Sequence, residues 1–114
     1  MIAVNKEAIQ KEHVDGWYSQ WETLREQIHI AHEARNGEAK PLMEQGIEHF
    51  IQFVLKVSDE HELKADADYE VLPVNAQERL NFIQNKPGQY ACYRQLDELY
   101  KETKKRCARL RLKA

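Results

Sequence analysis

The chain has 114 residues, of which 42% are hydrophobic and 32% are charged, and its formal net charge is −2. This length favours a single domain, and the apolar content is too high for a disordered protein. No run of apolar residues approaches the roughly 18 that a membrane span needs, so we expect no membrane partner. The first residues lack the pattern of a secretion signal, and we expect a cytoplasmic protein whose two Cys stay reduced.

The first segment, residues 6–35, has the periodicity of a helix. Gly16 interrupts the pattern and marks a position where this helix can kink or break. Asn36 and Gly37 then supply the left-handed backbone conformations that end a helix and turn the chain. The apolar stripe recurs at alternating steps of three and four residues: Val14, Trp17, Trp21, Leu24, Ile28 and Ala31.

A second helix follows directly, with Pro41 in its first turn, where a missing backbone N–H costs nothing. It continues to about Val57, and its apolar surface is wider than one stripe. This width indicates burial on more than one side, so we expect this helix at the centre of the fold. Gly46 lies on the apolar surface and either lets a neighbouring helix approach closely or is a weak spot that the helix tolerates.

Residues 58–72 form a different kind of segment, with six acidic residues against a single Lys64 and no convincing stripe. We expect an irregular, solvated crossover with a short helical turn around residues 61–65. Tyr69, Val71 and Leu72 should return to the core. A calcium loop needs a Gly at its turn, and this segment has none, so it predicts no metal site.

Two further helices complete the pattern. A short helix over residues 76–85 should bury Leu80 and Ile83, with Asn75 and Glu78 forming a capping box at its start. Pro87 opens a last helix that extends to about Arg111. Four helices of this kind predict an all-α, single-domain helical bundle over residues 1–114, with a long acidic crossover between helices two and three. The stripe of the last helix comprises Tyr93, Leu96, Tyr100, Thr103, Cys107 and Leu110.

The run Leu72-Pro73-Val74-Asn75, followed by Glu78-Arg79-Leu80, resembles a signature of the YpoC-like family, which comprises small uncharacterised proteins of Firmicutes. The resemblance covers about residues 17–102 and implies a helical fold and a bacterial cytosolic origin. It implies no reaction and no catalytic residues, and family members carry a longer N-terminal segment than this chain. The other matching positions are Trp21, Leu24, Arg35, Ala39, Pro41, Met43, Ile83, Pro87, Tyr90, Gln95, Leu96 and Leu99.

The chemistry-bearing residues give little support to catalysis or metal binding. Glu26 and His29 form one Glu-x-x-His pattern without the second copy that a di-metal bundle uses, so we predict no metal and no cofactor. Arg25 and His32 resemble the Arg and His motif of the HEPN ribonucleases, in which Arg holds phosphate and His moves protons. Glu26 would oppose phosphate at that motif. We therefore predict no catalytic residue.

The last part of the chain is strongly basic. Residues 101–114 hold seven basic residues and one acidic residue, a net charge of +6, whereas the preceding 100 residues carry −8. We expect residues 103–114 to form a frayed, solvated helix end. This end could bind phosphates or an acidic partner, or dock onto the acidic crossover of its own or a neighbouring chain. The candidate binding residues here are Lys104, Lys105, Arg106, Arg109 and Arg111.

Three aromatic residues provide a second candidate surface. Trp17, Tyr18 and Trp21 lie within one and a half helical turns, and we expect that they cannot all face one core, with Tyr18 projecting elsewhere. The leading interpretation is a non-catalytic protein-interaction module that binds an unknown protein partner or a second copy of itself. The alternative is a nucleic-acid-binding protein that uses the basic helix end. A HEPN-like ribonuclease is the third hypothesis.

Overall fold

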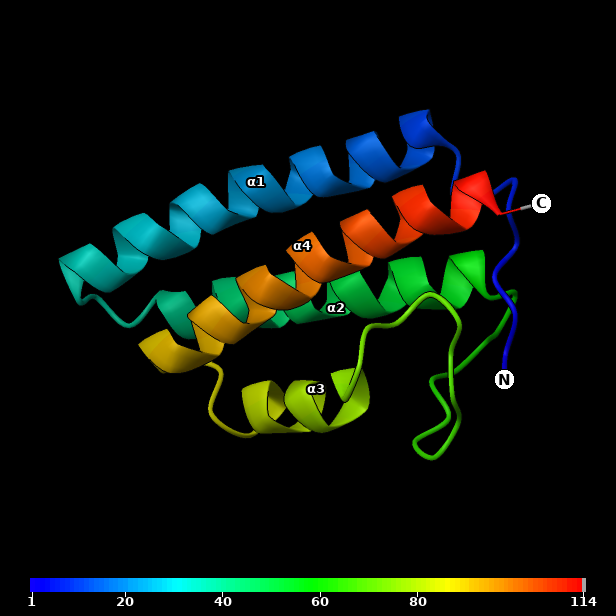
Figure 1. The fold of residues 1–114 in the computed structure, drawn as a ribbon. Helices are drawn as coiled ribbons and strands as arrows, with labels where there is room; N and C mark the ends of the chain where they lie inside the picture. The colour runs from blue at the N-terminus through cyan, green and yellow to red at the C-terminus, as the bar shows by residue number, and fades with distance from the viewer. Residues whose placement is uncertain (114) are drawn as a thin grey trace.

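The computed structural model describes residues 1–113, which fold into an all-α bundle, as predicted (Figure 1). No strand forms in this part of the chain, and a single isolated bridge pairs Ile2 with Tyr69. None of the helices described combines the length and the apolar character needed to cross a bilayer. The helices are α1 (Lys11–Ala34), α2 (Ala39–Val57), α3 (Ala76–Asn85) and α4 (Tyr90–Leu112).

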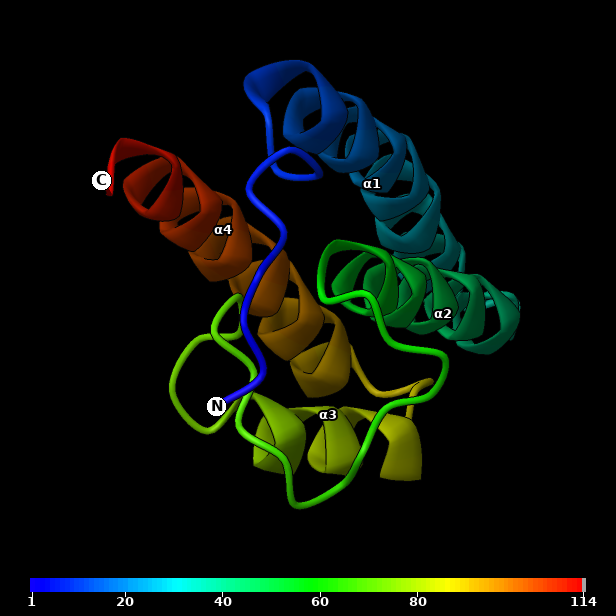
Figure 2. The ribbon, with the colours of Figure 1, turned by 90° about the vertical axis from the view of Figure 1, so that its right-hand side faces the viewer.

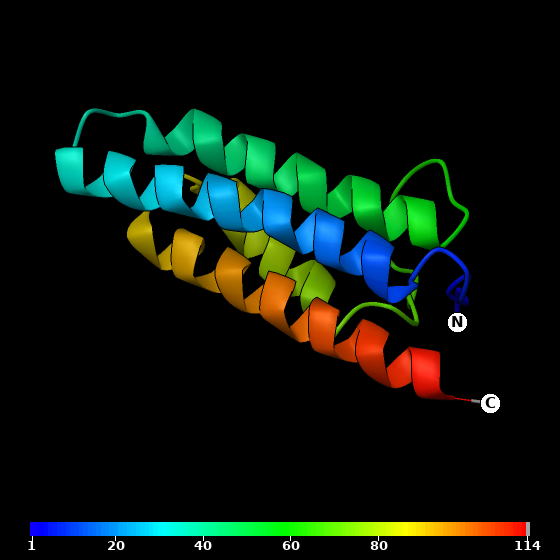
Figure 3. The ribbon, with the colours of Figure 1, turned by 90° about the horizontal axis from the view of Figure 1, so that it is seen from above.

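The helices are arranged around α2 and α4. Helices α1 and α2 form an antiparallel pair, and α1 lies over the junction between α2 and α4 (Figure 3). The short α3 packs against α4 and α2 on the other side of the molecule. Viewed end-on, α1 and α3 therefore lie on opposite sides of α4 (Figure 2). This arrangement leaves one side of the α1–α4 seam open to solvent.

The centre of the core is a close approach of α1, α2 and α4. The ring of Trp21 stacks on Tyr100, with centroids 4.2 Å apart and planes 3° from parallel. The Tyr100 hydroxyl donates a hydrogen bond to the carbonyl oxygen of Gly46. A Cβ at Gly46 would lie 2.9 Å from Cζ3 of Trp21, closer than packed carbon atoms allow. The sequence left two interpretations of Gly46 open. The structure supports the first of them, the close approach of a neighbouring helix.

The boundaries of α1 differ from the expectation. The helix begins at Lys11, because residues 6–9 form a turn in which the Glu7 N–H donates to Oδ1 of Asn5 at 3.0 Å. Gly16 lies within a continuous helix, so the predicted kink or break does not occur. Arg35, with φ of 51°, supplies the left-handed residue that closes the helix.

The acidic crossover is irregular, as predicted, and its last residues return to the core: Tyr69, Val71 and Leu72 are buried. The helical turn expected around residues 61–65 is wrong, because only bends and turns form there. The capping box is also wrong. Asn75 has a left-handed backbone with φ of 58°, whereas an N-cap that binds the first-turn amides requires an extended one, and its side chain makes no cap hydrogen bond.

The basic end of α4 is ordered and docked, so the expectation of a frayed end is wrong for residues 103–112; Ala114 lies outside the described residues. The helix continues to Leu112, and Thr103, Cys107 and Leu110 are buried on its inner face. Arg106 Nε donates to the carbonyl oxygen of Glu70, which ties α4 to the acidic crossover of its own chain. The apolar stripe continues to the end of α4, and its burial outweighs the repulsion among the cations.

Candidate functional site

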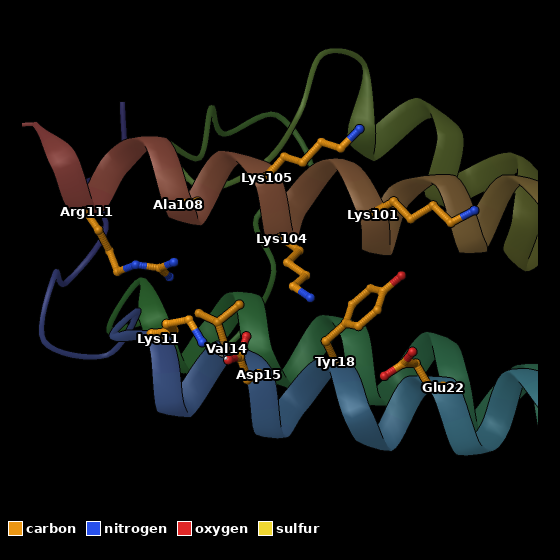
Figure 4. Close-up of a pocket in the computed structure, with 10 residues that line it drawn as sticks. All are labelled: Lys11, Val14, Asp15, Tyr18, Glu22, Lys101, Lys104, Lys105, Ala108 and Arg111. Atoms are coloured by element: carbon orange, nitrogen blue, oxygen red, sulfur yellow. Dashed lines mark hydrogen bonds and ion pairs between the residues drawn. The ribbon is translucent and has the colours of Figure 1, made fainter.

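A groove runs along the seam between the N-terminal half of α1 and the C-terminal half of α4 (Figure 4). Its volume is about 640 Å³. We call it the basic groove, because five of its side chains are basic and two are acidic. The lining residues are Lys11, Val14, Asp15, Tyr18 and Glu22 from α1 and Lys101, Lys104, Lys105, Ala108 and Arg111 from α4.

The floor of the basic groove is apolar. Val14 and Tyr18 are four residues apart on α1 and so share one face, and Ala108 faces them from α4. Lys104 reaches from α4 toward Tyr18, and its Nζ lies 4.4 Å from the centroid of the Tyr18 ring. This is the geometry of a cation–π contact. The groove thus combines an apolar base with an ammonium group held against an aromatic face.

Two of the five basic side chains are paired with carboxylates. Lys11 Nζ lies 2.8 Å from Oδ2 of Asp15, and this hydrogen bond raises the pKa of Lys11 and lowers the pKa of Asp15. Lys101 Nζ lies 3.1 Å from Oδ2 of Asp97. Within residues 1–113, the remaining three form no ion pair: Lys104, Lys105 and Arg111. Lys104 and Arg111 point toward α1 and bring uncompensated positive charge into the groove, whereas the side chain of Lys105 extends from α4 away from α1 (Figure 4).

Arg111 also holds the end of the groove in place. Its Nη1 donates to the carbonyl oxygen of Ile9 at 2.8 Å, just before α1 begins. Nearby, Lys6 Nζ donates to the carbonyl oxygen of Lys113 at 2.7 Å. The two walls of the groove are thus joined at the end where both termini of the chain lie.

The structure brings some of the predicted binding residues together and separates others. Tyr18 and the cations Lys104, Lys105 and Arg111 line the basic groove. Arg106 instead turns toward Glu70, and Arg109 is exposed without being among the residues that line the groove.

The expectation that the three aromatic residues cannot share a core is wrong. Trp17, Tyr18 and Trp21 are only 6%, 9% and 0% exposed. Because α1 lies over the junction between α2 and α4, a wide arc of its surface is covered. Trp17 stacks on Phe53 of α2 at a centroid distance of 3.9 Å, whereas Trp21 stacks on Tyr100 of α4. Tyr18 faces the groove from the edge of this core.

Several lining residues were missed from the sequence. Lys11 and Asp15 carried one signal, since their spacing of four residues suits an ion pair on a helix surface. Val14 was assigned to the core, and Ala108 and Glu22 carried no signal. Their common location depends on α1 pairing with α4, which the spacing within one helix cannot reveal.

The residues of the HEPN-like hypothesis lie elsewhere on α1. Arg25 Nη1 lies 3.1 Å from Oδ1 of Asp97, so its guanidinium is already paired with a carboxylate. His32 packs against Tyr93, and burial lowers the pKa of its imidazole. Neither residue lines the basic groove. Among residues 1–113, no three or more His, Cys, Asp or Glu side chains gather in a way that could hold a metal ion.

Comparison with known proteins agrees with the family resemblance that the sequence motif indicates. A protein of Bacillus subtilis (strain 168) named "Uncharacterized protein YpoC" is 47% identical over 51 residues, which are 45% of this chain and 30% of that protein. The match thus spans less than a third of the length of that relative. No solved structure matches this chain. A family model described as YpoC-like protein matches residues 11–114, and the chain therefore belongs to the YpoC-like family.

Proposed function

We propose that this chain is a single helical domain that works as a non-catalytic protein-interaction module in the bacterial cytoplasm. Its docking surface is the basic groove, and the partner presents an acidic segment with an apolar side chain. One observation supports this proposal above all: an apolar floor flanked by the cations Lys104 and Arg111, which form no ion pair in the described part of the chain.

The chemistry of the groove suits a protein partner. An apolar side chain can pack beside Tyr18 and Ala108, while carboxylates next to it pair with Lys104 and Arg111. Tyr and Arg are the residue types that most often dominate binding energy at protein interfaces, and complementary charge speeds association. A groove of about 640 Å³ accommodates a few side chains of such a segment.

Nucleic acid is the second candidate partner, supported by the exposed cations Lys105 and Arg109 on α4. Its support is weaker because the cations of α4 do not form one continuous surface. Lys104, Lys105 and Arg111 line the groove, whereas Arg106 turns toward Glu70 and Arg109 lies outside the lining. A ribonuclease has still less support, because Arg25 is already paired with Asp97.

The test places a photoreactive amino acid at Ala108 in the groove and crosslinks the protein inside bacterial cells. We expect a discrete crosslinked protein. The double substitution Lys104→Glu/Lys105→Glu should abolish it, because it replaces two cations by anions at the docking surface.

Matched controls separate the groove from general charge effects. Arg109→Glu/Lys113→Glu makes the same change in charge on the same end of the chain but outside the groove lining, and it should leave the crosslink intact. A photoreactive group at Ile30, exposed near the other end of α1, should not give the same product. Loss of the crosslinked species on nuclease treatment would favour nucleic acid. A crosslink that survives Lys104→Glu/Lys105→Glu would refute the groove as the docking site.

A further inference from the structure

A second surface on this chain has chemistry complementary to the basic groove. A hollow of about 620 Å³ lies beside α3, flanked by Val74 and Phe82, which are 78% and 54% exposed. An adjacent hollow of about 390 Å³ separates α3 from the acidic crossover. Asn75 and Glu78 line both hollows, so the two form one continuous surface. We call it the α3 face, defined by Asp66, Asp68, Val74, Glu78 and Phe82.

The α3 face is acidic because its one cation, Arg79, is partly buried and is neutralised by Glu102. Arg79 donates two hydrogen bonds to the carboxylate of Glu102, at 3.0 and 2.6 Å, and this bidentate pair lowers the pKa of Glu102. The exposed carboxylates have no ion-pair partner within residues 1–113: Asp66, Asp68 and Glu78. The face therefore offers two exposed apolar side chains among uncompensated negative charges.

We propose that the acidic segment bound by the basic groove is the α3 face of a second copy of this chain. This inference rests on the proposed function and names its partner. Phe82 of one copy packs beside Tyr18 and Ala108 of the other, while Glu78 and the crossover carboxylates face Lys104 and Arg111. The chain is nearly neutral, with a net charge of −2, yet its last 14 residues carry +6. Such segregation of charge favours contact between unlike ends of two copies.

The position of the two surfaces determines how copies would assemble. Helices α1 and α3 lie on opposite sides of α4 (Figure 2). The basic groove is lined by α1 and α4, whereas the α3 face is formed by α3 and the chain before it. Different patches therefore meet in each contact, and every bound copy leaves one groove and one α3 face free. A contact of this heterologous type continues into open chains or closes into a ring. Association should thus extend beyond dimers as concentration rises.

Sedimentation velocity over a range of concentrations tests the inference. The wild-type mass should rise from the 13.5 kDa of one chain to more than twice that value. Lys104→Glu/Lys105→Glu removes the groove, and Phe82→Asp removes the α3 face, so each variant alone should be monomeric. An equal mixture should form a dimer and nothing larger, because each variant retains the surface that the other lacks.

Two controls keep the result specific. Arg109→Glu/Lys113→Glu matches the charge change, and Ile30→Asp matches the loss of an exposed apolar side chain; both should associate like the wild type. Circular dichroism checks that every variant keeps the helical fold. Raising the salt concentration to about 0.5 M should weaken wild-type association, because it screens exposed charges.

The outcomes distinguish this inference from the proposed function. A wild type that stays at the mass of one chain, or a mixture that stays monomeric, overturns self-association through these faces. If such a monomer still crosslinks a different protein at Ala108, the groove remains a docking surface and only its partner is wrong. An oligomer that neither variant dissolves overturns the inference as well.

Discussion

At the scale of single residues, the two helical glycines of α1 and α2 have opposite roles. A Cβ at Gly46 would meet Trp21 at 2.9 Å and Leu96 at 3.2 Å. The indole cannot move aside, because it stacks on Tyr100 and donates to Asp97. Gly46→Ala should therefore lower the free energy of unfolding by about 1–3 kcal/mol, despite the higher helix propensity of Ala.

Gly16 is the matched control for that substitution, since a Cβ placed there would have no atom within 4 Å beyond its chain neighbours and the backbone of its own helix. Gly16→Ala should raise the free energy of unfolding by up to about 1 kcal/mol, because Ala is the better helix former. Urea unfolding followed by circular dichroism measures both variants. Equal effects of the two substitutions would contradict the close approach at Gly46.

Asp97 controls the response of the core to acid. Burial raises the pKa of this carboxyl, but hydrogen bonds from Trp21, Lys101 and Arg25 outweigh burial and hold the pKa below its ordinary value of 3.8. The ionised carboxylate therefore contributes stability that is complete above about pH 4 and is lost as pH falls through the lowered pKa. Asp97→Asn should cost about 1–3 kcal/mol at pH 7 and clearly less near pH 3.

Unfolding in urea at the two pH values measures this difference. Glu98→Gln is the control, because Glu98 is exposed on the same helix and its carboxylate makes only a long contact, 4.0 Å, with the ammonium of Lys101. It should change stability by less than about 0.5 kcal/mol. If Asp97→Asn costs as much near pH 3 as at pH 7, the ionised form is not what stabilises the core.

At the scale of elements, α4 carries a thiol probe near each end. Cys92 and Cys107 are both fully buried, and burial raises the pKa of Cys107 to about 11. In the native protein at pH 8, a disulfide reagent should label both thiols at least about 100-fold more slowly than in the unfolded chain. Rapid labelling of Cys107 with slow labelling of Cys92 would mean that the basic end frays, as the charge pattern alone had predicted.

The helices were predictable as elements to the extent that apolar spacing determines them. The stripes of α2 and α4 continue to Val57 and Leu110, close to where these helices end. Local signals at helix starts were less reliable. Asn75 matched a capping pattern, yet the return of Leu72 to the core leaves Asn75 in a left-handed conformation that cannot cap. The burial of Leu72 determines the backbone conformation of Asn75, and a short sequence motif cannot predict that burial.

At the scale of the whole molecule, the two ends of the chain stabilise each other. Cutting the chain after Thr103 would remove Cys107 and Leu110 from the core together with the Arg111 hydrogen bond to Ile9. We expect this truncation to cost more than about 4 kcal/mol and to abolish cooperative unfolding, since losing one buried Leu side chain alone costs 2–5 kcal/mol. Thermal unfolding measures it, and a truncated chain as stable as the full one would contradict the docking of α4.

The candidate site was only half predictable for the same reason. The cations of α4 and the aromatic Tyr18 were singled out from charge and spacing, but as two separate surfaces. Their union in one groove depends on which helices become neighbours, and each amphipathic stripe is compatible with several partners. The sequence pattern also placed Trp17 and Trp21 on a patch, because it could not show that two different helices cover them.

The pairing of α1 with α4 has a consequence for how the protein folds during its synthesis. During synthesis, α1 exposes Trp21 and Val14 until α4, which is made about 80 residues later, emerges to cover them. Contacts between such distant segments form slowly, and an uncovered apolar helix attracts other chains in the meantime. Ribosome-bound chains that stop before residue 100 should therefore bind chaperones. Chains in which an added C-terminal linker lets all of α4 leave the exit tunnel should not bind them.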